Sequence, residues 1–391
     1  MKAASDFTEC KKTSSVRKET NRLREQISRL QLFYLMMWVI LATGYLTLPF
    51  AISHFTQRDG WLVPIPFLAG IWLVFLLTLA FSRHFPRQTI TEGLQTALGS
   101  LVGGFLSFIL SIWFFIFICI VVRELVTFVD VTILPETPYY VTAAVVLASV
   151  AYAVSLGLEC LGRIAEIVTP MVMVLSASLL LLALQHADFT HIQPILADNW
   201  HPVLKGSVLP WTFAVELCLV IPLSRYLKGP AIKLRDGFIF GLILAVIGIL
   251  IELAVIAVLR STLQFSNYPI LEAVRTISYG QFFEHLDPLY VVAITLTILV
   301  KLSVIQYGWV VELQQLLKLK DYRPAVWSTS FAAWAGSIFL FPNTTALNDF
   351  MLFSAFSYFV LTVLLSLSLA VGVQSLRSLI HGSDKSPNPR H

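Results

Sequence analysis

The chain has 391 residues, of which 57% are hydrophobic and only 13% are charged, and its formal net charge is +4. A water-soluble protein of this length needs a mostly polar exterior, so this composition excludes an ordinary soluble globular fold. Lipid is the solvent that such a chain fits.

Apolar runs of about 20 residues recur along the chain, which is the length that an α-helix needs to cross about 30 Å of hydrocarbon. Backbone polar groups in lipid must find their partners within the segment, and a helix achieves this. The sequence therefore predicts an all-α polytopic membrane protein with ten transmembrane helices. In chain order the predicted spans are 32–56, 61–83, 101–123, 139–157, 164–184, 207–226, 237–259, 288–316, 324–341 and 350–376.

The distribution of lysine and arginine predicts the orientation of these spans. With the amino terminus in the cytoplasm, 21 of the 27 lysines and arginines fall in cytoplasmic segments and 5 in outer segments. This bias predicts that both termini are cytoplasmic. The polar start of the chain indicates no cleavable signal peptide. We divide the chain into a basic cytoplasmic tail (1–30), a first five-helix repeat (31–184), an outer loop (185–206), a second five-helix repeat (207–380) and a second cytoplasmic tail (381–391).

The first span contains a glycine and a proline within the sequence TGYLTLP, from Thr43 to Pro49. Proline lacks a backbone donor and clashes with the carbonyl group four residues earlier, which leaves the carbonyl of Tyr45 free. Gly44 tolerates unusual backbone angles. One interpretation is a simple proline kink. The other is a discontinuous helix whose exposed backbone groups face a cavity.

The sixth span repeats this pattern, because Pro210 and Pro222 flank Glu216 near the midpoint of 207–226. A carboxyl group at the bilayer centre costs about 3 kcal/mol. We therefore expect Glu216 to face the interior of the bundle, either as a functional group or as a hydrogen-bond partner of a neighbouring helix.

The eighth span carries Lys301 one residue from the midpoint of 288–316. At this depth the amine cannot easily reach either membrane surface. It could act as a proton carrier or a fixed cation, or it could form a structural ion pair with Glu216 or Glu252.

Three unusual features thus share one depth in the membrane. The first and sixth spans are equivalent in a five-plus-five division of the chain, and they run in opposite directions. This pattern is typical of an inverted repeat with a central site built from two broken helices.

The residues of several segments resemble those of one family, the B subunit of bacterial spore germinant receptors (the GerAB type of spore germination protein). The resemblance runs from about Ile27 to Leu376. The strings that carry it are ATGYLTLPF, DGW (Asp59–Trp61), PETPYYV (Pro135–Val141), RIAEI (Arg163–Ile167), FAVELCLVIP (Phe213–Pro222), FFEHLDPLYV and FPNTTALNDF.

This resemblance implies a LeuT-like fold, related to the amino acid/polyamine/organocation transporters, with ten spans in two inverted repeats and broken helices one and six. It implies a place in the inner membrane of the spore, receptor A and C subunits as partners, and a small germinant, often an amino acid, as ligand. One departure is His285, where we expect arginine in relatives. The implied ligand-binding residues are Thr43, Gly44, Tyr45, Leu46, Thr47, Phe213 and Glu216, and Lys301 with Glu216 would carry a coupling charge or proton.

Three functions remain open from the sequence: a ligand sensor, a proton-coupled amino-acid transporter, and a scaffold for other subunits. No catalytic constellation, metal-ligand cluster or phosphate-binding loop is visible. We therefore expect no enzymatic activity, no metal or other cofactor, and no nucleic-acid partner, but contact with membrane lipid. The four cysteines show no paired spacing and are interpreted as packing residues.

Overall fold

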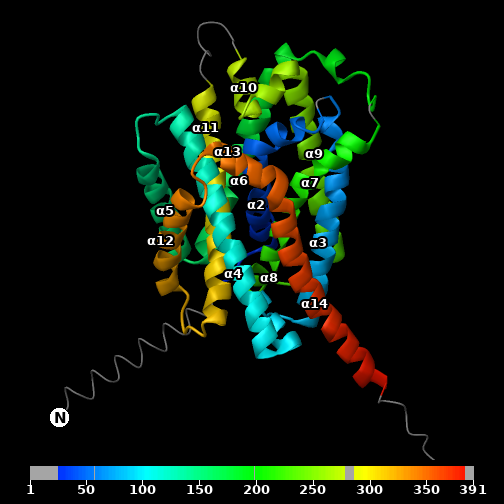
Figure 1. Ribbon diagram of the computed structural model, residues 1–391, viewed down its shortest axis with the longest axis vertical. Helices are drawn as coiled ribbons and strands as arrows, with labels where there is room; N and C mark the ends of the chain where they lie inside the picture. The colour runs from blue at the N-terminus through cyan, green and yellow to red at the C-terminus, as the bar shows by residue number, and fades with distance from the viewer. Residues whose placement is uncertain (1–24, 57, 198, 278–285, 384–391) are drawn as a thin grey trace, which may run out of the picture.

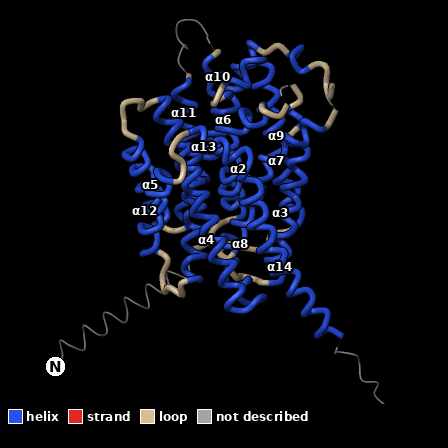
Figure 2. Tube along the Cα trace, viewed as in Figure 1, coloured by secondary structure: helices blue, strands red, loops and turns tan. Residues whose placement is uncertain are grey.

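The computed structural model describes residues 25–56, 58–197, 199–277 and 286–383, which form a bundle of helices (Figures 1 and 2). No strand occurs within these ranges. The first half contains α2 (Arg29–Ser53), α3 (Pro64–His84), α4 (Ile90–Thr132), α5 (Tyr139–Ser155) and α6 (Leu158–Ala183). The second half contains α7 (His201–Ala214), the 3-10 stretch η4 (Val215–Leu219), α8 (Val220–Ser224), α9 (Leu234–Leu259), α10 (Pro269–Arg275), α11 (Asp287–Leu316), α12 (Arg323–Phe339), α13 (Thr344–Asp349), the π-helical stretch η6 (Phe350–Ser354) and α14 (Ala355–Ser383). Short 3-10 turns at Gly60–Leu62, Leu184–His186, Phe189–Ile192 and Arg260–Phe265 complete the connections.

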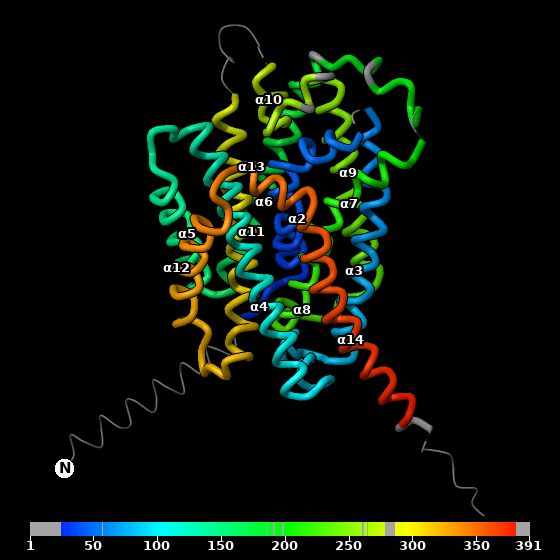
Figure 3. Tube along the Cα trace, viewed as in Figure 1, coloured from blue at the N-terminus to red at the C-terminus, as the bar shows by residue number. Residues whose placement is uncertain are grey.

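The predicted all-α membrane architecture is confirmed, but the number of ten spans is not. Eight helical stretches of the described chain are long and apolar enough to cross a membrane. The other two predicted spans correspond to α5 and α12, which have 17 residues each. A helix of that length rises about 25 Å, the lower end of what a span requires. These two short helices pack against each other at one edge of the bundle (Figure 3).

Helix α2 lies inside the bundle and is buried over most of its length, whereas α6 and α14 expose most of theirs (Figure 1). Its neighbours include α6, α7 and α11. In a membrane protein the exposed apolar faces of the outer helices meet lipid, so the interior helices are the ones that can carry polar groups. We call the two ends of the bundle the α10 end and the α14 end, after the helices found there.

The two spans that were expected to be broken differ from each other. Helix α2 is one continuous α-helix through Pro49, so the discontinuous interpretation of the first span is wrong and a proline-containing helix is what forms. The sixth span is interrupted as predicted, because η4 separates α7 from α8. The tighter 3-10 turns directly precede α8, whose third residue, Pro222, lacks a backbone N–H. Glu216 lies within η4.

Helix α4 bends near its start, because Gly99 adopts a left-handed φ of +84°. Glycine accepts this conformation without steric cost. The arm that precedes the bend begins at Ile90, where a buried carboxylate satisfies free backbone donors. Glu312 of α11 accepts hydrogen bonds from the N–H groups of Ile90 at 2.9 Å and Thr91 at 2.8 Å. This contact ties the first turn of α4 to α11. The partial positive charge at the helix N-terminus favours a negatively charged carboxylate at this position.

Candidate functional site

A buried ion pair occupies the interior of the bundle. Lys301 of α11 donates a hydrogen bond from Nζ to Oε1 of Glu216 at 2.9 Å and another to Oγ1 of Thr43 at 2.7 Å. The side chains of Lys301 and Glu216 are both 0% exposed, so the pair depends on its own hydrogen bonds rather than on solvent. Of the two partners that the sequence left open for Lys301, Glu216 is the one observed. We call Thr43, Glu216 and Lys301 the polar centre.

Two phenylalanine rings enclose the amine of the polar centre. Nζ of Lys301 lies 5.2 Å from the ring centroid of Phe117 on α4 and 5.1 Å from that of Phe213 on α7. An aromatic face attracts a cation, and the attraction is stronger away from water. The lysine therefore joins α2, α4, α7, η4 and α11 at a single point.

The five predicted residues of the first span divide between two sides of α2. In a continuous helix, residues three or four apart share a face, while adjacent residues do not. Thr43, Leu46 and Thr47 therefore lie on the face toward the polar centre. Gly44 and Tyr45 line a separate cavity between α2, α3 and α9. The predicted segment is thus not a single binding surface.

The cavity on the Gly44 side is small, with a volume of about 50 Å³, and mostly apolar apart from Glu252. The carbonyl group that Pro49 leaves free is found beside it. The hydroxyl of Tyr290 donates a hydrogen bond to the carbonyl oxygen of Tyr45 at 2.9 Å. The backbone acceptor that the sequence identified is therefore already satisfied by a side chain.

On the Thr47 side of α2, the structure reveals a residue that the sequence analysis did not select. Glu124 of α4 lines a pocket of about 30 Å³ together with Thr47 and Asn267. Its side chain is buried, with 7% of the residue exposed. The expected third span ended at residue 123, where Arg123 and Glu124 resemble a polar helix end. Because α4 continues to Thr132, Glu124 lies within the bundle instead.

The Glu124 pocket adjoins a larger cavity at the α10 end, whose volume is about 590 Å³. The two share part of their lining, so they lie next to each other between the α10 end and the polar centre. The shared residues are Thr127, Asn267, Tyr268 and Thr344.

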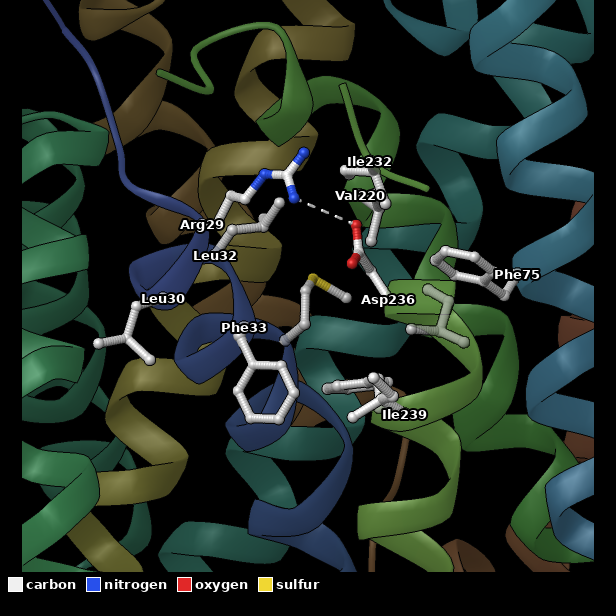
Figure 4. A pocket seen from close by; sticks show the side chains of 12 residues that line it. Arg29, Leu30, Leu32, Phe33, Phe75, Val220, Ile232, Asp236 and Ile239 are labelled. Carbon is white, nitrogen blue, oxygen red and sulfur yellow. Dashed lines mark ion pairs between the residues drawn. The ribbon is translucent and has the colours of Figure 1, made fainter. Parts of the chain in front are cut away.

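A further cavity of about 330 Å³ lies near the α14 end, between α2, α8 and α9 (Figure 4). Its lining is almost entirely apolar, with Met36 and Leu217 among the residues that face it. Among the described residues that line it, the charged ones are Arg29 and Asp236, which pair with each other at 3.6 Å. This composition suits lipid tails or apolar side chains better than a polar ligand.

Comparisons with known proteins agree with this architecture. A family model described as spore germination protein matches residues 26–346. Spore germination protein XB of Bacillus anthracis is 25% identical over 284 residues, which cover 70% of this chain and 78% of that protein. Spore germination protein KB of Bacillus subtilis (strain 168) is 26% identical over 307 residues, covering 76% and 80%.

Two solved transporter structures share the fold. MhsT in complex with L-phenylalanine superposes with a TM-score of 0.66 at 13% identity and covers 91% of this chain and 98% of that chain. Mhp1, a nucleobase-cation-symport-1 family transporter with bromovinylhydantoin bound, gives a TM-score of 0.60 at 14% identity, covering 93% and 81%. At this identity the likeness concerns the fold alone, and it confirms the expected LeuT-like architecture.

Proposed function

The chain belongs to the spore germination protein family, and from this premise we propose that it binds a small germinant, an amino acid, at the polar centre. The observation that carries the proposal is Lys301, whose amine is held between Thr43 and Glu216 where the sixth span is interrupted. Charged side chains inside a membrane bundle are costly, and a ligand site is a common reason for them.

The contacts of the polar centre suggest how binding is communicated. Thr43 belongs to the first five helices, whereas Glu216 and Lys301 belong to the second five. A ligand that changes the contacts among these three residues shifts the position of one repeat against the other, by as much as its affinity for the two arrangements differs. In this proposal the shift is passed to receptor A and C subunits.

The proposed setting is the inner membrane of the spore, with both termini in the cytoplasm and the α10 end outside. The bias of lysine and arginine supports this orientation. In this orientation the 590 Å³ cavity opens away from the cytoplasm. Germinant reaching the spore from outside would then approach the polar centre by way of Glu124.

A proton-coupled transporter is the second candidate. It is favoured by the 2.9 Å contact between Lys301 and Glu216, because a buried amine and carboxyl at this distance can exchange a proton. The two candidates differ in whether bound ligand crosses the membrane.

Equilibrium binding to the purified full chain in lipid nanodiscs tests the proposal. The probes are the twenty common L-amino acids in radiolabelled form. We expect at least one to bind the wild type, and Glu216→Leu to abolish that binding while the protein still inserts. Cys160→Ser, at a partly exposed position on α6, is the control. Binding that survives Glu216→Leu unchanged would place the site elsewhere.

A further inference from the structure

We propose that Glu124 receives a positively charged amino group of the ligand, which arrives from the α10 end. The inference rests on the proposed function and makes it more specific, because it requires the ligand to be a cation at this point. Neither the polar centre nor the resemblance to a known family assigns a role to Glu124.

Glu124 lies on α4 between the polar centre and the α10 end of the bundle. Phe117, which contacts the amine of Lys301, precedes it by two helical turns on the same face of α4. On α2, Thr47 lies one turn beyond Thr43 and lines the Glu124 pocket. On both α4 and α2, a residue that contacts Lys301 is thus followed, toward the α10 end, by a residue that lines the Glu124 pocket.

Glu124 is a buried carboxylate without a matched donor. Its Oε2 atom has no hydrogen-bond partner in the described part of the chain. The neighbouring Arg123 turns away and lies 4.3 Å from the ring of Tyr139. Lys301 is close enough for a Coulombic interaction, but its hydrogen bonds go to other residues. A buried carboxylate left without donors is costly, so a ligand that supplies N–H donors and a positive charge is stabilised there.

Glu216 is the second buried carboxylate of this region that has an unpaired oxygen atom. Oε2 of Glu216 also lacks a hydrogen-bond partner among the described residues, although its Oε1 accepts from Lys301. Two carboxylates therefore share one amine around the polar centre. An additional ammonium group would balance the charges, whereas an anionic group would add to the imbalance.

The lining of the two cavities on the α10 side favours a cation as well. Among the described residues that line the two adjoining cavities, none is lysine or arginine, and the charged ones are Glu124 and Glu272. Glu272 pairs with Arg275 at 2.9 Å, so Glu124 is the carboxylate of this lining without a cationic side chain paired to it. A cleft lined by one sign of charge concentrates ligands of the opposite sign.

The volumes of the two cavities indicate which part of the ligand each of them can hold. The 30 Å³ of the Glu124 pocket is about the volume of one water molecule, which matches an ammonium group but not a whole amino acid. The 590 Å³ cavity has room for the remainder of the ligand while its ammonium group is held at Glu124, before the ligand reaches the polar centre. Neutral polar side chains such as Asn267 and Thr344, which line both cavities, are suited to its other polar groups.

Charge-selective labelling tests this role without knowledge of the ligand. In a chain whose Cys10, Cys119, Cys160 and Cys218 are replaced by alanine, Thr127→Cys places a thiol on the shared wall. Its labelling rates with a methanethiosulfonate that carries an ammonium group and one that carries a sulfonate are compared. We expect Glu124→Gln to lower the cation-to-anion rate ratio by about tenfold. Glu252→Gln, which alters a buried carboxylate in the separate cavity, leaves the ratio unchanged.

Binding provides the second readout. The radiolabelled L-amino acids are compared with the 2-hydroxy acids that replace the amino group by a hydroxyl. We expect the wild type to prefer the amino acid and Glu124→Gln to lose about tenfold in affinity for it. Should Glu124→Gln not fold, Asn267→Lys places a competing ammonium group on the shared wall and is expected to produce the same two losses.

The outcomes separate the two proposals. A rate ratio and an amino-acid affinity that are both unchanged in a folded Glu124→Gln protein overturn the role of Glu124 and leave the proposed function standing. Absence of any amino-acid binding to the wild type overturns the proposed ligand class, while the labelling ratio still decides whether Glu124 attracts cations.

Discussion

The hydroxyl of Tyr290 on α11 donates a hydrogen bond to the carbonyl oxygen of Tyr45 on α2 at 2.9 Å. This carbonyl is the one that loses its helical partner because Pro49 has no N–H. A side chain from the second half of the chain therefore supplies a donor to this backbone acceptor of the first half, and α2 is continuous through Pro49.

Tyr290→Phe is expected to destabilise the protein by about 1–3 kcal/mol, because the buried carbonyl of Tyr45 is left without a donor. Thermal unfolding in nanodiscs measures the loss. Tyr152→Phe, on an exposed face of α5, is the control and should have little effect. In a Pro49→Ala background, the restored N–H of residue 49 can bond the same carbonyl. Tyr290→Phe should then cost clearly less, and an equal cost in both backgrounds would contradict this explanation.

The ion pair of the polar centre predicts strong coupling between its members. Lys301→Met or Glu216→Leu alone leaves an uncompensated buried charge, with an expected cost of about 3–5 kcal/mol each. The double variant removes both charges, so its cost should be far below the sum of the two. The free energy of unfolding, from titration of the purified protein with SDS, measures all three. Additive costs would mean that the 2.9 Å contact contributes no coupling.

Lys301 and Glu216 could be selected from the sequence because each interrupts an apolar run near its midpoint. Their pairing could not, because the facing of a side chain depends on the rotation of its helix. For the same reason, the sequence could not show that Thr43 and Gly44 lie on different sides of α2. Whether adjacent residues present one surface or two depends on whether the helix is continuous. The donor that replaces the N–H missing at Pro49 comes from Tyr290, which lies 245 positions from Tyr45.

Glu124 was missed for a different physical reason. Hydropathy places the end of a span where charged residues begin, and Arg123 with Glu124 marked such an end. In the structure, contacts of Arg123 with the Tyr139 ring and with the carbonyl oxygen of Pro342 at 3.4 Å allow α4 to continue. The fold class follows from apolar length alone, whereas a buried charge beside a span end requires tertiary contacts to be recognised.

The start of α4 has a capping box of Thr89 and Glu92, and one buried carboxylate of α11 satisfies two further backbone donors there. Glu312→Ala removes the acceptor of the N–H groups of Ile90 and Thr91, and we expect a local loss of about 1–3 kcal/mol. Hydrogen exchange of residues 90–98 should accelerate accordingly, while α9 remains unchanged. Glu159→Ala, which removes a half-exposed carboxylate on α6, serves as the control. Unaltered exchange in the Glu312 variant would show that the arm is held by its capping box and its apolar contacts.

The cavities near the α10 end and the α14 end differ in polarity, and this difference predicts that the ligand binds without being transported. On the α10 side, adjoining cavities lined by Glu124 and neutral polar side chains lie between that end and the polar centre. On the α14 side, the cavity that reaches Leu217, next to Glu216, is almost entirely apolar. Its charged residues, Arg29 and Asp236, pair with each other. A zwitterion would lose its hydration there without compensating partners, at a cost of several kcal/mol.

Proteoliposomes that contain the purified chain decide this point. With an inward proton gradient, an amino acid that binds the wild type should remain at the level of bound ligand rather than accumulate. Vesicles without protein and vesicles with Glu216→Leu give the background for leakage and for binding. Accumulation that is driven by the gradient and abolished by Lys301→Met would identify a transporter, because only a coupled carrier uses the buried Lys301–Glu216 pair to move substrate against its concentration.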